Sequence, residues 1–204
     1  MKYLIIGVIT LFITLLVSRV FMALNSDNYN MYNTKSTQKS HVKSTAKLEK
    51  TGKSIYLVYC SSCHGYDGKG NNDKAQNHTK RMAKKSVLDV IKNGSNNFTS
   101  LYPLGMPAGL ISGDDAQKVA DFVANGMRGE RPKAWSKCVT CHDESGEGIA
   151  QIAPNIKTYS DELVETVLKN GKKGVIGIMP SFKGRLSDVQ MKSLATYIRS
   201  IAVK

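Results

Sequence analysis

Two copies of a five-residue motif contain all four cysteines of this 204-residue chain, CSSCH at 60–64 and CVTCH at 138–142. Two cysteines three positions apart lie on the same side of one helical turn, so both thiols can reach the vinyl groups on one edge of a porphyrin. The histidine that follows can give an imidazole nitrogen to the iron. This is the pattern of covalent c-type haem attachment, and two copies predict two haem c groups. The candidate residues are the thioether-forming Cys60, Cys63, Cys138 and Cys141 and the axial ligands His64 and His142.

A pair of cysteines at this spacing also occurs in zinc sites and in redox-active dithiols. A single zinc site could even combine the two motifs. Neither alternative requires a histidine directly after the second cysteine, twice, with no cysteine left over. The two motifs therefore favour haem over zinc or dithiol chemistry.

Two methionines are the candidates for the second axial position of each iron. Met106 and Met179 each precede a proline, and each follows a helical segment in a glycine-rich loop. A thioether is a suitable ligand for low-spin haem iron, and Met/His ligation raises the reduction potential. A methionine is more often simply packed in a core, but two at matched positions downstream of two haem motifs favour ligation.

His78 and Met82 are rival ligands in the first copy of the motif. Both lie in a polar loop with several lysines, and such loops run over the protein surface. The sequence therefore predicts that these two side chains are exposed and do not bind iron.

The two motifs begin two copies of a longer repeat. In each copy an amphipathic segment ends in Lys-Asn-Gly, at 86–94 and at 162–171, where glycine is a typical helix stop. Each copy ends in a further helix, at about 114–125 and 187–201. Glycine and proline interrupt helical periodicity between the copies, at 126–132. No segment predicts a convincing strand, so the expected fold is all-α.

The N-terminal segment predicts a membrane anchor. An unbroken apolar run from Tyr3 to Val17 resumes after Ser18 and Arg19 and ends at Leu24. The whole span is roughly 33 Å long as a helix, which is enough to cross a bilayer. A cleaved signal peptide remains an alternative. The predicted organisation is an anchor, a flexible polar tether, and a first and a second cytochrome c domain, at 1–24, 25–50, 51–127 and 128–204 respectively.

The chain carries a formal charge of +13, from 29 basic and 16 acidic residues. A basic chain can bind nucleic acid, anionic lipid or an acidic protein. No nucleic-acid-binding motif is present, so we expect no nucleic-acid partner. A solvated basic surface and attraction of an acidic redox partner are the two remaining explanations.

The repeat resembles the class I cytochrome c domain, twice over. More specifically, it is similar to the CcoP/FixP family, the di-haem subunit III of cbb-type (C-family) haem–copper cytochrome c oxidases. The resemblance rests on four stretches, at 60–70, 90–109, 115–132 and 174–182. This chain has one apparent membrane span, whereas many relatives have a longer membrane portion.

The resemblance implies an electron relay anchored in the bacterial inner membrane by a single span. Haem is attached outside the cytoplasm in bacteria, so the haem domains are expected in the periplasm. A soluble cytochrome or a quinol-oxidising complex would donate electrons. The mono-haem cytochrome c subunit and the oxygen-reducing catalytic subunit of the oxidase would receive them. Oxygen chemistry would not occur on this chain.

The resemblance also implies two kinds of contact inside each domain. Class I domains pack their first helix against their last, so Tyr56 and Trp135, which precede the motifs, are expected to meet Phe122 and Tyr197. In the same family a proline carbonyl accepts a hydrogen bond from the iron-ligating histidine. Pro154 would have this role for the second motif, and the first copy has no matching proline.

Three alternative functions remain open from the sequence. The chain could be the di-haem subunit of a quinol:cytochrome c reductase or a free membrane-tethered shuttle. It could be an enzyme such as a di-haem peroxidase, which needs an open iron site. It could also be a haem-based sensor, which needs an output domain that the sequence does not show.

Overall fold

The computed structural model describes residues 44–71 and 75–202. The predicted anchor at 1–24 and most of the predicted tether lie outside these residues. Within the described part, no helix is long and apolar enough to cross a bilayer. Residues 44–50, which end the predicted tether, are helical. The chain divides into two units, 1–46 and 47–204, and the second unit contains both Cys-x-x-Cys-His motifs.

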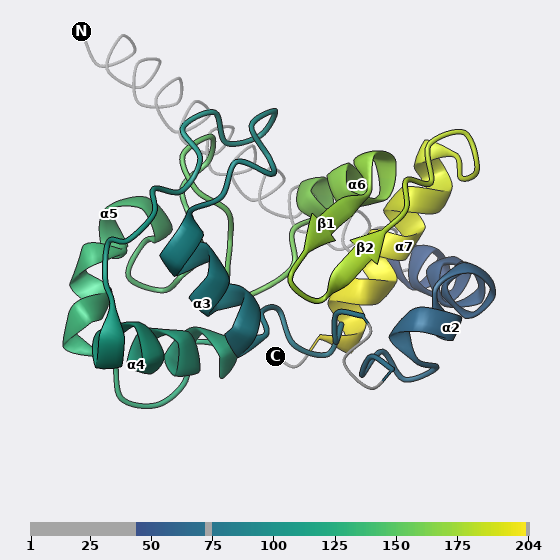
Figure 1. The fold of residues 1–204 in the computed structure, drawn as a ribbon. Coiled ribbons are helices and arrows are strands. Elements are labelled where there is room, and N and C mark those ends of the chain that lie inside the picture. The colour runs from purple at the N-terminus through teal and green to yellow at the C-terminus, as the bar shows by residue number, and fades with distance from the viewer. Residues whose placement is uncertain (1–43, 72–74, 203–204) are drawn as a thin grey trace, which may run out of the picture. The chain divides into compact units, whose positions relative to one another are not determined.

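The described elements follow the order that the repeat predicts, with a motif, a helix, a methionine loop and a helix in each copy (Figure 1). After a helix through 44–59 they are α2 (Ser61–His64), α3 (Lys84–Asn93), α4 (Gly113–Ala124), the 3-10 helix η1 (Lys133–Lys137), α5 (Val139–His142), α6 (Asp161–Asn170), β1 (Lys172–Gly174), β2 (Gly177–Met179) and α7 (Asp188–Ile201). The all-α prediction needs one correction. β1 and β2 form a short antiparallel hairpin with Lys172 opposite Met179.

Side-chain caps begin the two helices of the second copy. Ser160 accepts a hydrogen bond from the Leu163 backbone N–H at the start of α6. Ser187 and Gln190 form the reciprocal capping box at the start of α7, as their spacing predicts. These caps satisfy backbone donors that have no partner inside a helix, and they fix where α6 and α7 begin.

Two separate hydrophobic cores hold the described part together. The terminal core consists of Tyr56, Cys60, Val164, Leu168, Phe182, Leu186, Met191, Leu194, Ala195, Tyr197 and Ile198. The middle core consists of Val87, Ile91, Ala116, Val119, Ala120, Phe122, Val123, Trp135 and Cys138. Each core therefore combines one haem motif with helices from the other copy of the repeat.

The predicted contacts of Tyr56 with Phe122 and of Trp135 with Tyr197 are wrong, because the partners are exchanged between the copies. Tyr56 meets Tyr197 edge to face, with ring centroids 5.2 Å apart. Trp135 meets Phe122 in the same manner at 5.9 Å. Figure 1 shows α2 beside α7, while α3, α4 and α5 lie together. The helix before the first motif thus packs on the last helix of the second copy.

Gly52 allows the helix at 44–59 to cross α7 closely. A Cβ atom at this position would overlap the carbonyl oxygen of Ser193 and would lie 2.8 Å from Cβ of Tyr197. Only a residue without a side chain lets the two helix backbones approach to this extent. The glycine therefore selects α7 as the partner of this helix.

The connection between α4 and η1 explains the exchange at the middle core. Gly126, Met127 and Gly129 all have positive φ angles, of 70°, 64° and 95°. This conformation reverses the chain within a few residues, and helices joined by short loops pack as antiparallel neighbours. The reversal places Trp135 directly on α4, where its ring meets that of Phe122.

Candidate haem-binding sites

The two motifs have the same local conformation. Each first cysteine ends an incoming helix and is buried, with Cys60 at 6% and Cys138 at 8% exposure. Each second cysteine, Cys63 or Cys141, is exposed. Each motif therefore has one thiol in a core and one thiol at the surface. All four cysteines are free thiols in this structure.

The thiol of Cys60 is held in its protonated form. Burial raises its pKa to about 11, with a further contribution from Cys63. Burial likewise raises the pKa of the Cys138 thiol, and Cys141 adds to the effect. Since the thiolate is the reactive form for metals and oxidants, the raised pKa makes these two thiols less reactive than a free cysteine.

Both motif histidines are buried, and one ring nitrogen of each is occupied. Nδ1 of His64 lies 2.8 Å from the carbonyl oxygen of Gln76, and Nδ1 of His142 lies 3.2 Å from that of Pro154. Such a bond makes Nδ1 the protonated nitrogen and leaves Nε2 as the free donor atom. In the described residues, neither Nε2 has a hydrogen-bond partner. Burial lowers the pKa of both rings, so each is neutral and able to bind iron.

Pro154 has the predicted role, and Gln76 is its counterpart in the first copy. A search for a proline could not find Gln76, because the acceptor is a backbone carbonyl, which any residue provides. Both acceptors lie 12 positions after their histidine. This shared spacing, and not the residue type, is the signal that could have identified Gln76.

Met106 and Met179 are held by matching backbone pairs. Met106 pairs with Ser95, with N–H to O distances of 2.8 and 2.9 Å, and Met179 pairs with Lys172. The glycine before each partner is required for this approach. A Cβ at Gly94 would lie 2.6 Å from the Met106 carbonyl oxygen, and one at Gly171 would lie 2.6 Å from that of Met179.

The cores bring each methionine to the motif of the other copy. Met179 packs against the terminal core, which contains Cys60. Met106 packs against the middle core, which contains Cys138. Both methionines are half-buried. The structure therefore gathers the predicted site residues into two sets, each of which takes its methionine from the other repeat.

His78 and Met82 are not on the surface, so that prediction was wrong. His78 is buried with its ring stacked on that of His64, at a centroid separation of 4.0 Å. Burial lowers the pKa of His78 to about 3, and His64 adds to the effect. Met82 is half-buried and packs against the middle core. Among the described residues of this loop Lys80 is exposed, whereas His78 is buried.

The chemistry of these residues fits a covalently bound haem. Each set has two thiols, an imidazole with a free Nε2 and a thioether sulfur. Each set also buries one polar atom without a partner among the described residues, Nδ1 of His78 and Nε1 of Trp135. A zinc site fits less well, because within 44–71 and 75–202 no three His, Cys, Asp or Glu side chains converge.

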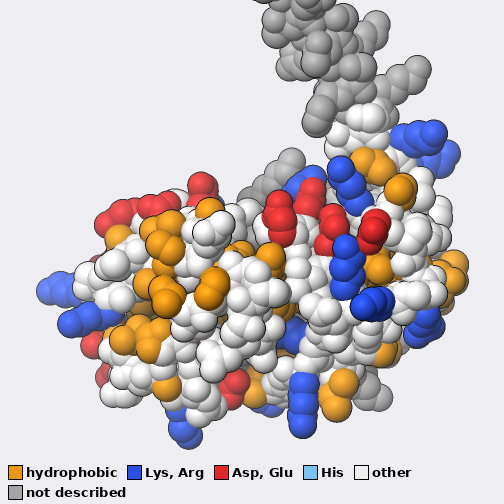
Figure 2. Space-filling model, turned by 90° about the horizontal axis from the view of Figure 1, so that it is seen from above, with side chains coloured by type: hydrophobic (Ala, Val, Ile, Leu, Met, Phe, Trp, Pro, Cys, Tyr) orange, Lys and Arg blue, Asp and Glu red, His pale blue; other side chains and the backbone are white. Residues whose placement is uncertain are grey.

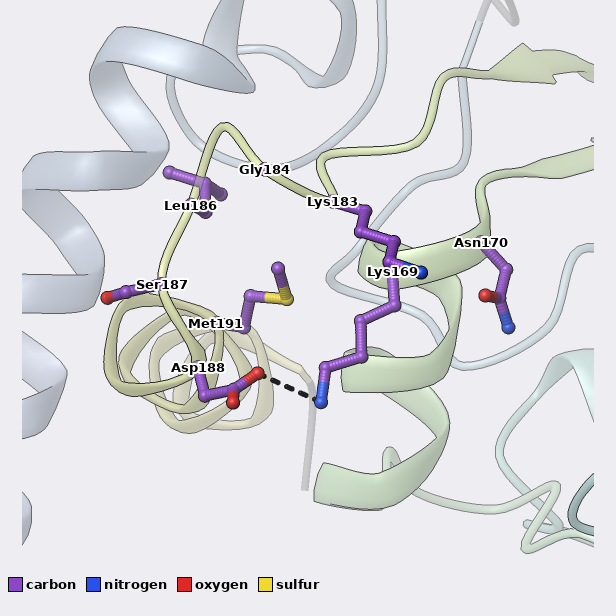
Figure 3. Close-up of a pocket in the computed structure, with 8 residues that line it drawn as sticks. All are labelled: Lys169, Asn170, Lys183, Gly184, Leu186, Ser187, Asp188 and Met191. Atoms are coloured by element: carbon purple, nitrogen blue, oxygen red, sulfur yellow. Dashed lines mark ion pairs between the residues drawn. The ribbon is translucent and has the colours of Figure 1, made fainter.

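A pocket of about 560 Å³ lies between the end of α6 and the start of α7 (Figure 3). Its main polar contact is the ion pair between Lys169 and Asp188, at 2.9 Å. The acidic member lies in the first turn of α7 and the basic member in the last turn of α6, where each complements its helix dipole. None of the lining residues is a predicted haem-binding residue. The pair therefore stabilises the contact between α6 and α7.

The surface shows no concentration of basic side chains on the face drawn in Figure 2. Lysine and arginine side chains are scattered there, with aspartate and glutamate between them. A groove for the nucleic-acid backbone would need a continuous basic stripe. The mixture of charges on this face is typical of an ordinary solvated surface.

Comparisons with known proteins give the family. The profile described as "Cytochrome C oxidase, cbb3-type, subunit III" matches twice in tandem, at residues 47–123 and 127–198. A CcoP subunit of a cbb3-type cytochrome c oxidase from Helicobacter pylori is 33% identical over 174 residues, which cover 76% of this chain and 59% of the relative. A FixP subunit from Bradyrhizobium diazoefficiens is 26% identical over 179 residues, covering 74% of this chain and 60% of the relative.

The chain spans about three fifths of the length of these curated relatives. A solved structure from Kuenenia stuttgartiensis, a reducing HAO-like protein complex, aligns at 20% identity over 74% of this chain and 96% of its own, with a TM-score of only 0.20. The two tandem matches are cytochrome c domains and imply two covalently bound haem c groups. The chain belongs to the family of subunit III of cbb3-type cytochrome c oxidases.

Proposed function

We propose that this chain is a membrane-anchored electron relay, which passes electrons through two haem c groups to the oxygen-reducing subunit of a terminal oxidase. Cys60 and Cys63 hold the first haem and Cys138 and Cys141 hold the second. Each bound iron supplies a one-electron ferric/ferrous couple. The protein's part is to fix the ligands, exclude water and set the distance between the haems.

We assign the axial ligands by core and not by repeat. His64 and Met179 bind the first iron, and His142 and Met106 bind the second. The observation that carries this assignment is the exchange of the cores, because Met179 packs with Cys60 and Met106 packs with Cys138. If both irons have six ligands, neither has an open position for substrate, and the chain acts by electron transfer alone.

The exchanged packing also supports a relay because it ties the two haem sites to each other. Each site depends on a methionine loop from the other copy, so the sites cannot move apart as two independent domains would. A fixed separation between two redox centres keeps the rate of transfer between them constant. Two unlinked domains would give a range of separations instead.

The location and partners follow from the family and from the N-terminal segment. We propose that residues 1–24 form a single span of the bacterial inner membrane, in contact with membrane lipid, and that the haem sites face the periplasm. The partners are the catalytic and mono-haem cytochrome c subunits of the oxidase. The electron donor is a soluble cytochrome or a quinol-oxidising complex.

Purification of the full chain in a mild detergent tests the proposed complex. Copper and haem b should co-purify with this chain in a fixed ratio. Cytochrome b with an iron–sulfur protein would instead show the subunit of a quinol:cytochrome c reductase. Purification of the chain alone, with both haems loaded, would support a free shuttle and contradict the oxidase assignment.

A further inference from the structure

Arg81 lies where the two copies of the repeat cross. Its Nε donates hydrogen bonds to the carbonyl oxygens of Asn155 and Thr158, each at 3.1 Å. Its guanidinium lies over the Tyr159 ring, 5.3 Å from the centroid, and the Tyr159 hydroxyl donates to the Lys80 carbonyl at 3.0 Å. Nη1 of Arg81 lies 3.0 Å from Sδ of Met82. The guanidinium is thus fixed by backbone groups, a ring and a thioether, and neither terminal nitrogen has an oxygen partner among the described residues.

Lys172 is a second cation in this region. Its Nζ lies over the Phe98 ring, 5.3 Å from the centroid. Lys172 is exposed, and its backbone pairs with that of Met179 in the hairpin.

Neither cation has an acidic partner within 44–71 and 75–202. The ion pairs of this part of the chain all involve other residues. A desolvated cation without a counter-ion destabilises a fold. Burial also lowers the pKa of the Arg81 guanidinium. The polypeptide alone leaves this region short of negative charge.

We propose that Arg81 and Lys172 bind propionate carboxylates of the haem groups at the crossing of the two repeats. A haem carries two propionates, and this chain binds two haems. The planar guanidinium matches a carboxylate with two parallel hydrogen bonds, and an ammonium adds a point charge. This inference needs the bound haems, but it does not depend on which methionine binds which iron.

The neighbours of the two cations indicate which haem each one serves. Arg81 donates to the carbonyl of Asn155, the residue after Pro154, whose carbonyl is the partner of His142. We therefore assign Arg81 to a propionate of the second haem. Lys172 pairs in the hairpin with Met179, which packs with the first motif. Each of the two cations would thus hold a propionate of a different haem.

The test compares four variants of the full, haem-loaded chain. Arg81→Gln and Lys172→Gln each remove one cation. Arg185→Gln removes a guanidinium that also lies over a ring, that of Phe182 at 5.0 Å, and Lys173→Gln removes the adjacent lysine of β1. The readouts are the midpoint potentials of the two haems and redox-induced infrared difference spectra, with the haem propionates labelled with ¹³C.

We expect Arg81→Gln to shift the labelled carboxylate bands and to lower the potential of one haem, because a lost positive charge favours the ferric state. Lys172→Gln should have the same effects to a smaller degree, and the two control variants should have neither. Met106→Ala and Met179→Ala, each of which moves the potential of one haem, identify which haem is affected.

Unchanged carboxylate bands in both Arg81→Gln and Lys172→Gln would overturn the proposal, even if the potentials moved, because the cations would then act only at a distance. If Arg81→Gln fails to retain its haems, Arg81→Lys is the variant that tests the proposal. It should keep the potential near that of the wild type while still shifting the bands, since it preserves the charge and loses the paired hydrogen bonds. Wild-type bands in Arg81→Lys and Lys172→Gln would refute it.

Discussion

The two haem motifs share the Cys-x-x-Cys-His pattern, but the chain closes the cores that contain them differently. The terminal core is closed by contacts between the two ends of the described chain, such as Tyr56 with Tyr197. The middle core is closed by neighbours in sequence, Phe122 and Trp135. A sequence repeat therefore need not be a packing unit. In this molecule each copy of the repeat contributes residues to both cores.

The surroundings of the motif histidines differ as well. Beside His64 the stacked residue is His78, whose backbone N–H donates to the Gly68 carbonyl at 2.6 Å. The equivalent residue in the second copy is Ile156, whose backbone N–H donates to the Gly146 carbonyl at 2.9 Å. The first copy thus has a polar ring at this position and the second copy has an aliphatic side chain, which packs against the middle core.

The largest expected effect comes from the exchanged methionines. In a chain with Cys60→Ser and Cys63→Ser, only the haem of the second motif can attach. Adding Met106→Ala should abolish the near-infrared thioether-to-iron charge-transfer band, because Met106 is the proposed ligand of that haem. Adding Met179→Ala should leave the band in place. Absorption spectra of the oxidised protein measure both results.

The reciprocal background, with Cys138→Ser and Cys141→Ser, is the control. There the band should be lost with Met179→Ala and retained with Met106→Ala. The opposite pattern in both backgrounds would show that each repeat ligates its own haem, and the comparison between the two sites would then reduce to their local surroundings.

A smaller effect is expected from Gly52→Ala, which acts only on the terminal core. The added methyl group would overlap the Ser193 carbonyl, so the helix at 44–59 must move away from α7. Overpacking of this kind lowers the free energy of unfolding by about 1–3 kcal/mol. Denaturant unfolding of the haem-loaded protein, followed by circular dichroism, measures the loss.

Gly174→Ala is the matched control, because a Cβ there meets nothing within 4 Å and the backbone conformation suits any residue. It should change the stability by less than about 0.5 kcal/mol. An equally small effect of Gly52→Ala would mean that the helix at 44–59 does not cross α7 closely in solution. The terminal core would then not be closed as the structure shows.

The smallest expected effect is that of His78→Ile, which makes the first site resemble the second. The variant removes a buried Nδ1 that has no partner among the described residues. It should therefore raise the free energy of unfolding by about 1 kcal/mol. The converse change, Ile156→His, should lower it by about 1–3 kcal/mol, because it adds an unpaired polar group to the middle core.

Thermal unfolding of both variants with their haems attached gives the comparison. A loss of stability in His78→Ile would show that the His78 ring has a hydrogen-bond partner in the haem-loaded protein, and the two sites would then differ in more than one neighbouring side chain.

Most of the elements and the candidate site residues could be identified from the sequence, because both depend on local signals. The Cys-x-x-Cys-His motifs, the glycine after α3 and α6, and the capping box at Ser187 act over a few residues each. The family pattern predicts the role of Pro154. It does not predict that of Gln76, because Gln76 acts through its backbone carbonyl and its side chain gives no signal.

The pairing of the helices could not be predicted from the repeat. Tyr56 and Trp135 have similar apolar surfaces, and so do α4 and α7, so the hydrophobic pattern permits either arrangement. The choice depends on two particular features. The positive φ angles at Gly126, Met127 and Gly129 turn η1 back onto α4, and Gly52 fits only where a helix backbone passes closely.

The exchange of cores also has a consequence for biogenesis. The middle core draws on a continuous stretch, from Val87 to Cys138, so it can form while the C-terminal part of the chain is still being synthesised. The terminal core cannot form until α7 has emerged, although Tyr56 and the first motif appear earliest. Contacts between distant segments form slowly. The first motif therefore stays open to the haem-attachment machinery for longer than the second, and its haem is expected to be enclosed last.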